Sequence, residues 1–412
     1  MLKNYFLVAW KVYMRRKLFT AINLLCIILT MVVLLMVTTV LQNAFFPSGV
    51  EGRSDRYLQV DTLVQLGKDD NIWMSPLGYK LIDQHFRKMK SVVKVAAITS
   101  PQDVSVYMKD RVEKLQIRYT DAAYWEILNF NIVAGRWPNA SDVEQGRFVV
   151  VLNASTAKKL FGEQTAIAQK INIQNQQFEV IGVVEDAFHF NAYSELWAPL
   201  TTMPSTDYMR KLDGDFTALL MAKTPADTGA IKAEVQEIAK TLKADDPKEW
   251  QTIRLFANSK LDMFARGFSN GNPEADSGAT TVLIWVAILM LIFMTLPALN
   301  LVNLNIGRML ERSSEIGVRK AFGATRMELV LQFLVENVFL CFLGCLLALL
   351  CTQLLLMWIS YSGIIPYLKV SVDLAIFGYG LVFSLIFGVM SGVLPAWKMA
   401  RLEPVLALKG NA

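Results

Sequence analysis

The stretch LFTAINLLCIILTMVVLLMVTTVLQNAFFPSGV, residues 18–50, contains no Asp, Glu, Lys or Arg. Three later stretches share this property, and each can hold the ~20 apolar residues with which a helix crosses a bilayer. A helix is favoured there because it satisfies its backbone hydrogen bonds internally. The sequence therefore predicts four transmembrane helices, which we place at residues 18–42, 280–306, 328–359 and 374–395. The three later stretches are Ser277–Gly307, Asn337–Leu368 and Leu374–Trp397.

Between the first two stretches lies a polar block, residues 43–279, with the composition of a folded domain. Helical periodicity occurs in residues 77–92 and 228–243, and Ala154–Phe161 is predicted to be a helix that ends at Gly162. The fold class is thus four transmembrane α-helices plus a large α+β extracytoplasmic domain inserted between helices 1 and 2. Strands are predicted at Val104–Met108, Lys114–Arg118, Phe148–Leu152, Lys170–Ile173 and Gln177–Val184, the last two joined by Asn175-Gln176.

Charge is distributed unevenly along the chain. Residues 43–279 carry 27 Lys and Arg against 30 Asp and Glu, whereas the remainder carries 14 against 6. This basic excess lies before the first span, in the 307–327 link and after the fourth span. The positive-inside rule therefore places both termini in the cytoplasm and the polar block outside. We expect residues 1–17 to form a cytoplasmic amphipathic helix, 360–373 an outer loop and 396–412 a cytoplasmic tail.

Residues that usually carry chemistry are scarce. All four cysteines fall in predicted spans, where buried apolar thiols are the simplest interpretation. His85 and His189 are the only histidines, and the polar block has no Ser/His/Asp, Cys/His or metal-ligand spacing. The sequence lacks a Gly-x-x-x-x-Gly-Lys-Ser/Thr phosphate loop, and the polar block lacks the basic cluster of a nucleic-acid-binding protein. We therefore expect a chain that is not an enzyme and binds no cofactor, metal or nucleic acid.

The 307–327 link, GRMLERSSEIGVRKAFGATRM, is the sharpest local signal. Residues 315–322 can form two helical turns that end at the next residue, a glycine. Thr325 with Glu328 then fits a capping box that opens the third span. The resulting elbow has an apolar centre with charges around it, which suits a protein contact better than a lipid surface. Its candidate contact residues are Glu315, Ile316, Gly317, Val318, Arg319, Lys320, Phe322 and Gly323.

Small and ionisable residues inside the spans give two further expectations. Ser384, Gly388, Gly392 and Ala396 repeat at four-residue spacing in the fourth span, a pattern typical of close helix packing. Packing within one subunit and packing between subunits both fit the pattern. Glu336 is the one carboxylate near membrane depth, and a functional role and an interfacial position both fit it.

On these residues the chain resembles the MacB/FtsX-like permease family of ABC transporters. Arg312–Thr325 resembles the motif Arg-x-x-Glu-Ile-Gly-x-Arg-Lys-Ala-Phe/Leu-Gly-Ala-Thr that follows the family's second span, and Leu394–Val405 resembles its closing segment. One departure is Ala168, where many relatives have Gly. The polar block resembles a MacB-like periplasmic core domain in the order of its landmarks Gly135-Arg136, Val149–Asn153, Leu160-Phe161-Gly162 and Val180–Val184.

The resemblance implies a non-catalytic permease in the bacterial inner membrane, with a β-rich subdomain at about residues 120–195 of a periplasmic domain. It implies an ABC ATPase dimer as a separate partner that binds ATP and Mg²⁺ and contacts the elbow. A second permease subunit, identical or homologous, and membrane lipid are further implied partners, as are a periplasmic adaptor and an outer-membrane duct. Motion of the ATPase would then pass through the spans to the outer domain.

Three classes of function compete for this architecture. The first is export or extraction of an antimicrobial, peptide, toxin or lipoprotein from the periplasm or outer leaflet. The second is a transporter-like regulator that activates a periplasmic cell-wall hydrolase. A third, a membrane-anchored sensor working without an ATPase, is disfavoured because the predicted tail after the fourth span is too short for a signalling domain. A neighbouring gene for an ATPase, an adaptor or a hydrolase would discriminate among the three.

Overall fold

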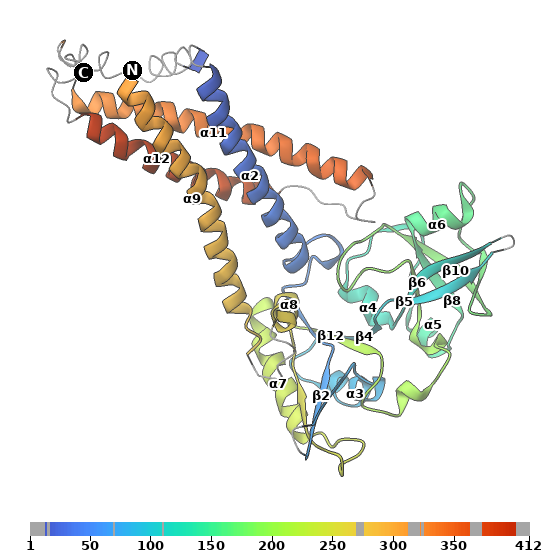
Figure 1. The fold of residues 1–412 in the computed structure, drawn as a ribbon. Helices are drawn as coiled ribbons and strands as arrows, with labels where there is room; N and C mark the ends of the chain where they lie inside the picture. The colour runs from blue at the N-terminus through green and yellow to red at the C-terminus, as the bar shows by residue number, and fades with distance from the viewer. Residues whose placement is uncertain are drawn as a thin grey trace. The chain divides into compact units, whose positions relative to one another are not determined.

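The structure is a computed structural model. It describes residues 13–14, 17–68, 71–108, 111–268, 276–311, 322, 325–362 and 373–400. The chain divides into two compact units, one built on strands and one on long helices (Figure 1). We call them the outer unit, residues 42–280 with 366–369, and the membrane unit, residues 1–41, 281–365 and 370–412.

A ten-stranded sheet forms the centre of the outer unit. Six of its strands close into a barrel, because β6, β11, β8, β10, β9 and β5 pair in that order and β5 pairs again with β6. From β6 the sheet continues through β4 and β12 to β1, and β7 pairs with β10. The strands are β1 (Tyr57–Val60), β4 (Lys94–Thr99), β5 (Gln102–Tyr107), β6 (Val112–Thr120), β7 (Ile132–Gly135), β8 (Val149–Asn153), β9 (Lys170–Ile173), β10 (Gln176–Val184), β11 (Leu196–Pro199) and β12 (Phe216–Met221).

A smaller antiparallel sheet and several short helices complete the outer unit. The order of the small sheet is β13–β2–β3. Its strands are β2 (Leu63–Gly67), β3 (Ile72–Ser75) and β13 (Trp250–Leu255). The helices are α3 (Tyr79–Gln84), α4 (Ala122–Ile127), α5 (Ala140–Glu144), α6 (Ala154–Phe161), α7 (Thr228–Thr241) and α8 (Lys260–Phe268).

Several local predictions are confirmed and two need correction. Helix α6 ends before Gly162, whose φ of +62° suits glycine, and α7 matches the predicted helix at 228–243. The β9–β10 hairpin turns at Gln174-Asn175, one residue earlier than predicted, because both residues adopt the positive φ of a tight hairpin turn. The helix predicted at 77–92 is shorter: α3 ends at Gln84, and the 3-10 turn Phe86–Lys88 then places the Phe86 side chain in the core.

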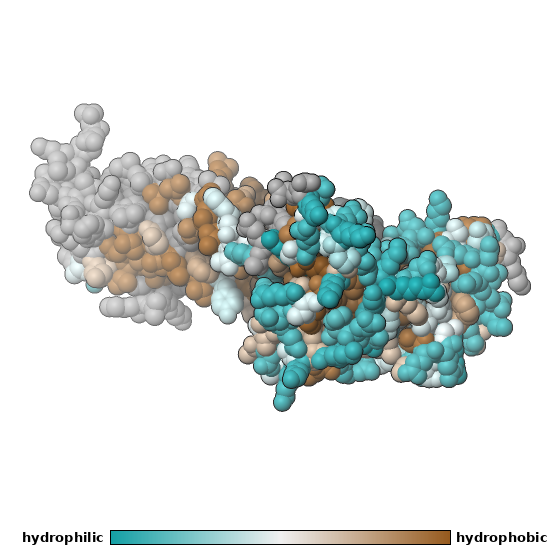
Figure 2. Space-filling view, turned by 90° about the horizontal axis from the view of Figure 1, so that it is seen from below, coloured by the Kyte–Doolittle hydropathy of each residue, from teal (hydrophilic) through white to brown (hydrophobic). Residues whose placement is uncertain are grey.

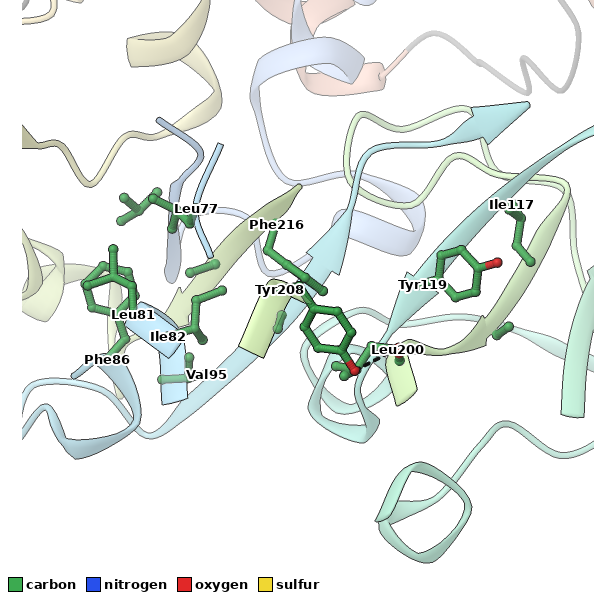
Figure 3. Packing of buried hydrophobic residues seen from close by; sticks show 14 of the residues in the cluster. Leu77, Leu81, Ile82, Phe86, Val95, Ile117, Tyr119, Leu200, Tyr208 and Phe216 are labelled. Atoms are coloured by element: carbon green, nitrogen blue, oxygen red, sulfur yellow. Dashed lines mark hydrogen bonds between the residues drawn. The ribbon is translucent and has the colours of Figure 1, made fainter. Parts of the chain in front are cut away.

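Two clusters of buried side chains make up the core of the outer unit. The larger cluster packs α3 and α7 against both sheets, and Figure 3 shows Leu81, Phe86, Tyr208 and Phe216 within it. The Tyr208 hydroxyl donates a hydrogen bond to the Leu200 carbonyl at 3.4 Å (Figure 3). The second cluster contains the aromatic residues Tyr124, Trp125, Phe130 and Trp197, whose neighbouring ring centroids lie 5.0–6.0 Å apart.

The membrane unit consists of apolar helices, and hydrophobic residues dominate its described surface in Figure 2. Among the described residues, Thr20–Phe45 and Val330–Ser362 are long and apolar enough to cross a membrane. Ala279–Phe293 and Leu374–Met390 are shorter apolar segments, so the count of four spans stays a prediction. The helices are α2 (Lys17–Phe45), α9 (Ala279–Glu311), α11 (Arg326–Ser362) and α12 (Leu374–Ala400).

Candidate functional site

Of the predicted coupling elbow, the 307–327 link, the structure describes residues 307–311, 322 and 325–327. Phe322 is 89% exposed. The capping box is confirmed, because the Thr325 N–H donates to Glu328 Oε2 at 2.9 Å and the Glu328 N–H donates to Thr325 Oγ1 at 3.3 Å. Helix α11 therefore begins at Arg326, with Thr325 as its N-cap. Glu315, Ile316, Gly317, Val318, Arg319, Lys320 and Gly323 lie outside the described residues.

Glu336 is buried within the membrane unit, with 5% of its surface exposed. Its Oε1 accepts a hydrogen bond from Gln332 Nε2 at 3.1 Å, one helical turn earlier on α11. The Tyr13 hydroxyl donates to the backbone carbonyl of Glu336, and the Tyr13 ring stacks on Phe339 at 6.1 Å. The contact from Tyr13 is therefore to the backbone of Glu336, whereas the hydrogen bond from Gln332 to its carboxylate lies within α11.

Glycines mark the close approaches between α2, α11 and α12. A Cβ added to Gly388 would lie 2.6 Å from Cys341 Sγ on α11. On α11, a Cβ at Gly344 would lie 2.6 Å from Cγ2 of Ile27 on α2. Both distances are shorter than real Cβ contacts allow, so these helices depend on glycine for their spacing. The surroundings of Gly392 lie outside the described residues.

A cluster of polar side chains that the sequence analysis does not predict lies where the outer unit continues into α2 and into α9. Helix α8 lies between them in the fold of the outer unit. Its Lys260 Nζ is 2.9 Å from Glu51 Oε2, six residues after α2, and the side chains are 5% and 0% exposed. Its Asp262 accepts a hydrogen bond from the hydroxyl of Ser277, two residues before α9.

Several donors surround the Asp262 carboxylate. Lys232 Nζ on α7 and the Ser259 N–H each lie 2.9 Å from Oδ2. Burial by itself raises the pKa of Asp262, but the hydrogen bonds from Ser277, Lys232 and Ser259 outweigh it and hold the pKa at about 2. The carboxylate is therefore ionised at physiological pH. The signature Ser-x-x-Asp at 259–262 is a capping box visible in the sequence, although its partners Lys232 and Ser277 are not.

A histidine lies beside the segment that follows α2. His189 Nε2 is 3.3 Å from Ser48 Oγ, and a Cβ at Gly49 would lie 2.7 Å from the imidazole ring. Burial lowers the pKa of His189, so it is neutral at physiological pH. Its role here is packing and hydrogen bonding, the structural role expected of a lone histidine.

The fold and these contacts define a class of protein: an apolar helix leads into a folded α+β unit, and further apolar helices follow that unit. The family model of the MacB-like periplasmic core domain matches residues 20–238, more than half of the chain. The model of the FtsX-like permease C-terminal region matches residues 287–404. The chain therefore belongs to the MacB/FtsX-like permeases of ABC transporters, a family of inner-membrane permeases with a periplasmic domain.

Curated relatives agree with this assignment. The uncharacterized ABC transporter permease YknZ of Bacillus subtilis is 25% identical over 328 residues, which cover 78% of this chain and 76% of the relative. The macrolide export ATP-binding/permease protein MacB of Neisseria gonorrhoeae is 25% identical over 288 residues, which cover 69% of this chain. The aligned part is only 42% of that MacB, so the chain spans less than half of this relative.

Solved structures of outer domains also match. The extracellular domain of the ABC-type transporter YknZ from Gram-positive bacteria is 16% identical, with a TM-score of 0.38, over 48% of this chain and 99% of that chain. The periplasmic region of MacB from Actinobacillus actinomycetemcomitans is 16% identical, with a TM-score of 0.39, over 53% of this chain and 95% of that chain.

Proposed function

We propose that this chain is the non-catalytic permease subunit of a MacB/FtsX-type ABC transporter and passes ATP-driven motion to its outer unit. An ABC ATPase dimer binds the 307–327 link from the cytoplasm, and a second permease, identical or homologous, completes the membrane part. The work is done on an antimicrobial, peptide, toxin or lipoprotein taken from the periplasm or outer leaflet. The role in macrolide export that the MacB relatives carry in their name supports an efflux function.

The observation that carries this proposal is the continuity of two helices. Helix α2 runs for 29 residues up to Phe45, which already belongs to the outer unit. Helix α9 runs for 33 residues from Ala279, also in the outer unit, to Glu311 beside the elbow. At 1.5 Å per residue α9 is about 50 Å long. The helix is continuous through Pro297, and a helix of this length can carry a displacement along its axis.

The surface of α9 supports a substrate route outside the membrane. Leu289, Ile292 and Leu299 are each more than half exposed on this helix. A conduit for polar cargo would need polar groups in such positions, because unpaired polar groups in hydrocarbon cost several kcal/mol each. An apolar surface fits a helix that contacts lipid or another apolar helix and transmits motion.

The proposal is tested at Phe322, with Tyr361 as the matched control. Both are exposed aromatic residues, 89% and 94%, and they lie beside opposite ends of α11. Phe322→Ala should weaken binding of the ATPase by about 2 kcal/mol, or roughly 30-fold in Kd, as loss of an aromatic anchor does. Tyr361→Ala should leave binding unchanged. Binding is measured by titration of purified ATPase onto full-length permease in detergent.

The double variant Glu315→Ala, Phe322→Ala gives the outcome that would contradict the proposal. Unchanged ATPase binding and unchanged ATP-driven efflux in this variant would make the elbow an ordinary loop. Loss of binding with normal membrane insertion would place the ATPase at this end of α11, and would make this end cytoplasmic.

A further inference from the structure

Helix α8 contacts both places at which the outer unit continues into a membrane helix. It has nine residues, and each of its contacts lies within residues 42–280. Two of its side chains, Lys260 and Asp262, are two positions apart and bond to opposite ends of the domain sequence. The Lys260–Glu51 pair is almost fully buried, whereas Asp262, 10% exposed, pairs with Lys232, which is 47% exposed.

The contact with the α2 side has an apolar part and a charged part. The Phe45 ring at the end of α2 lies 4.7 Å from the Phe264 ring of α8, centroid to centroid. Glu51 pairs with Lys260 at 2.9 Å, and its Oε1 accepts the Asn191 N–H at 2.6 Å. Separating Glu51 from Lys260 would leave two buried charges uncompensated, so this contact resists displacement strongly.

The contact with the α9 side is made by hydrogen bonds to one carboxylate. Asp262 accepts from the Ser277 hydroxyl, two residues before α9 begins, and from Lys232 Nζ of α7 at 2.9 Å. Charge-assisted hydrogen bonds are about twice as strong as neutral ones. Any shift of Ser277 therefore acts on α8 and, through Lys232, on α7.

Helix α8 is also connected to the ten-stranded sheet. Gln59 of β1 and Asn258, two residues before α8, exchange two backbone hydrogen bonds of 2.8 Å each. The Arg266 side chain of α8 donates to Asn258 Oδ1 at 3.0 Å, which ties the helix to the same point. Strand β1 is an edge of the ten-stranded sheet, so α8 is bonded to the sheet as well as to both chain connections.

We propose that α8 couples α2 and α9 to the large sheet. Lys260 and Asp262 are positioning residues that hold the outer ends of α2 and α9 to this one helix. A displacement of α2 relative to α9 then acts on α8 and passes through Asn258 to β1, rather than being absorbed by the connecting segments. The inference rests on the proposed function, because it specifies where the motion carried by α2 and α9 enters the sheet.

The test measures amide hydrogen exchange in the full-length permease bound to its ATPase, without nucleotide and after trapping with ATP and vanadate. In the unchanged protein we expect nucleotide to alter exchange in α2 and α9 and also in β1 and β12. In Ser277→Ala, and in the double variant Glu51→Gln, Lys260→Met, the change in β1 and β12 should be lost. ATP hydrolysis and the exchange change in α2 and α9 should persist.

Controls distinguish a helix that transmits motion from contacts that only stabilise the fold. Lys80→Met removes a half-exposed ion pair with Asp245 in the same unit, at 3.2 Å, and should behave as the unchanged protein does. Exchange of β8 and β10 without nucleotide reports whether each variant folds. Ser277→Ala removes a single hydroxyl, so it keeps the inference testable if the double variant fails to fold.

Two results would count against these ideas in different ways. A nucleotide-dependent change of normal size in β1 and β12 of folded Ser277→Ala would overturn the role of α8 and leave the proposed function intact. Absence of any nucleotide-dependent change in the outer unit of the unchanged complex would overturn the proposed function, and the inference with it.

Discussion

In the outer unit, large apolar side chains such as Phe216 are fully buried, whereas the membrane unit buries a smaller cluster that includes Ile27 and Leu340 and leaves side chains such as Leu289 more than half exposed. The close contacts of the membrane unit are made at glycines, as between Gly388 and Cys341. The difference follows from the solvent. Water drives apolar side chains into a core, but lipid offers no such drive, so membrane helices associate by close backbone approach and polar contacts.

The two units can also be compared in how they bury charged groups. The outer unit buries the Glu51–Lys260 pair and surrounds the Asp262 carboxylate with donors. In the membrane unit, Glu336 accepts from the amide of Gln332. Directional polar contacts therefore occur in both units, and in the outer unit two of them, Glu51–Lys260 and Asp262–Ser277, lie where the chain continues into α2 and α9.

The largest expected effect tests the core of the outer unit. Phe216→Ala should lower its free energy of unfolding by about 3–5 kcal/mol, because a fully buried aromatic ring is removed and a cavity is left. Leu289→Ala on α9 should cost less than about 1 kcal/mol, as an exposed position does. Amide exchange of β12 and α9 in the detergent-solubilised chain measures both. Equal losses would break the contrast between the two units.

An intermediate effect tests helix spacing in the membrane unit. Gly388→Ala should lower the stability of the α11–α12 pair by about 1–3 kcal/mol, the usual cost of overpacking, because its Cβ would lie 2.6 Å from Cys341 Sγ. Adding Cys341→Ala removes that sulfur and should restore most of the loss. Thermal unfolding midpoints of the full chain in one detergent measure the series. A neutral Gly388→Ala, or a double variant no better than the single one, would contradict the close approach.

The smallest effect has the opposite sign and lies in the outer unit. Ala168 has a φ of +64°, a conformation that costs a residue with a Cβ about 1–2 kcal/mol. Ala168→Gly should therefore stabilise the β9–β10 region by up to about 1 kcal/mol, after the greater loss of backbone entropy by glycine. Exchange of β9 and β10 amides measures it. A destabilised variant would show that the methyl group of Ala168 contributes more than the backbone conformation costs.

Local signals in the sequence predicted local structure well. The end of α6 at Gly162 and the capping box of Thr325 and Glu328 depend on residues within four positions of one another. Alternation predicts strands β5, β6 and β8, and a hairpin signal predicts β9 and β10. By contrast, β1, β2, β3, β4, β7, β11, β12 and β13 are not predicted; of these, β1, β11 and β12 are buried on both faces and therefore show no alternation.

By itself the sequence determined the apolar helices, the polar block between the first two of them, and the family, because each depends on composition or on short motifs. The tertiary structure alone decided that six strands close into a barrel and that Glu51 meets Lys260. It also decided that α3 ends at Gln84, where burial of Phe86 takes precedence over helical periodicity. These features depend on residues far apart in the chain, and only the packing of the whole outer unit brings them together.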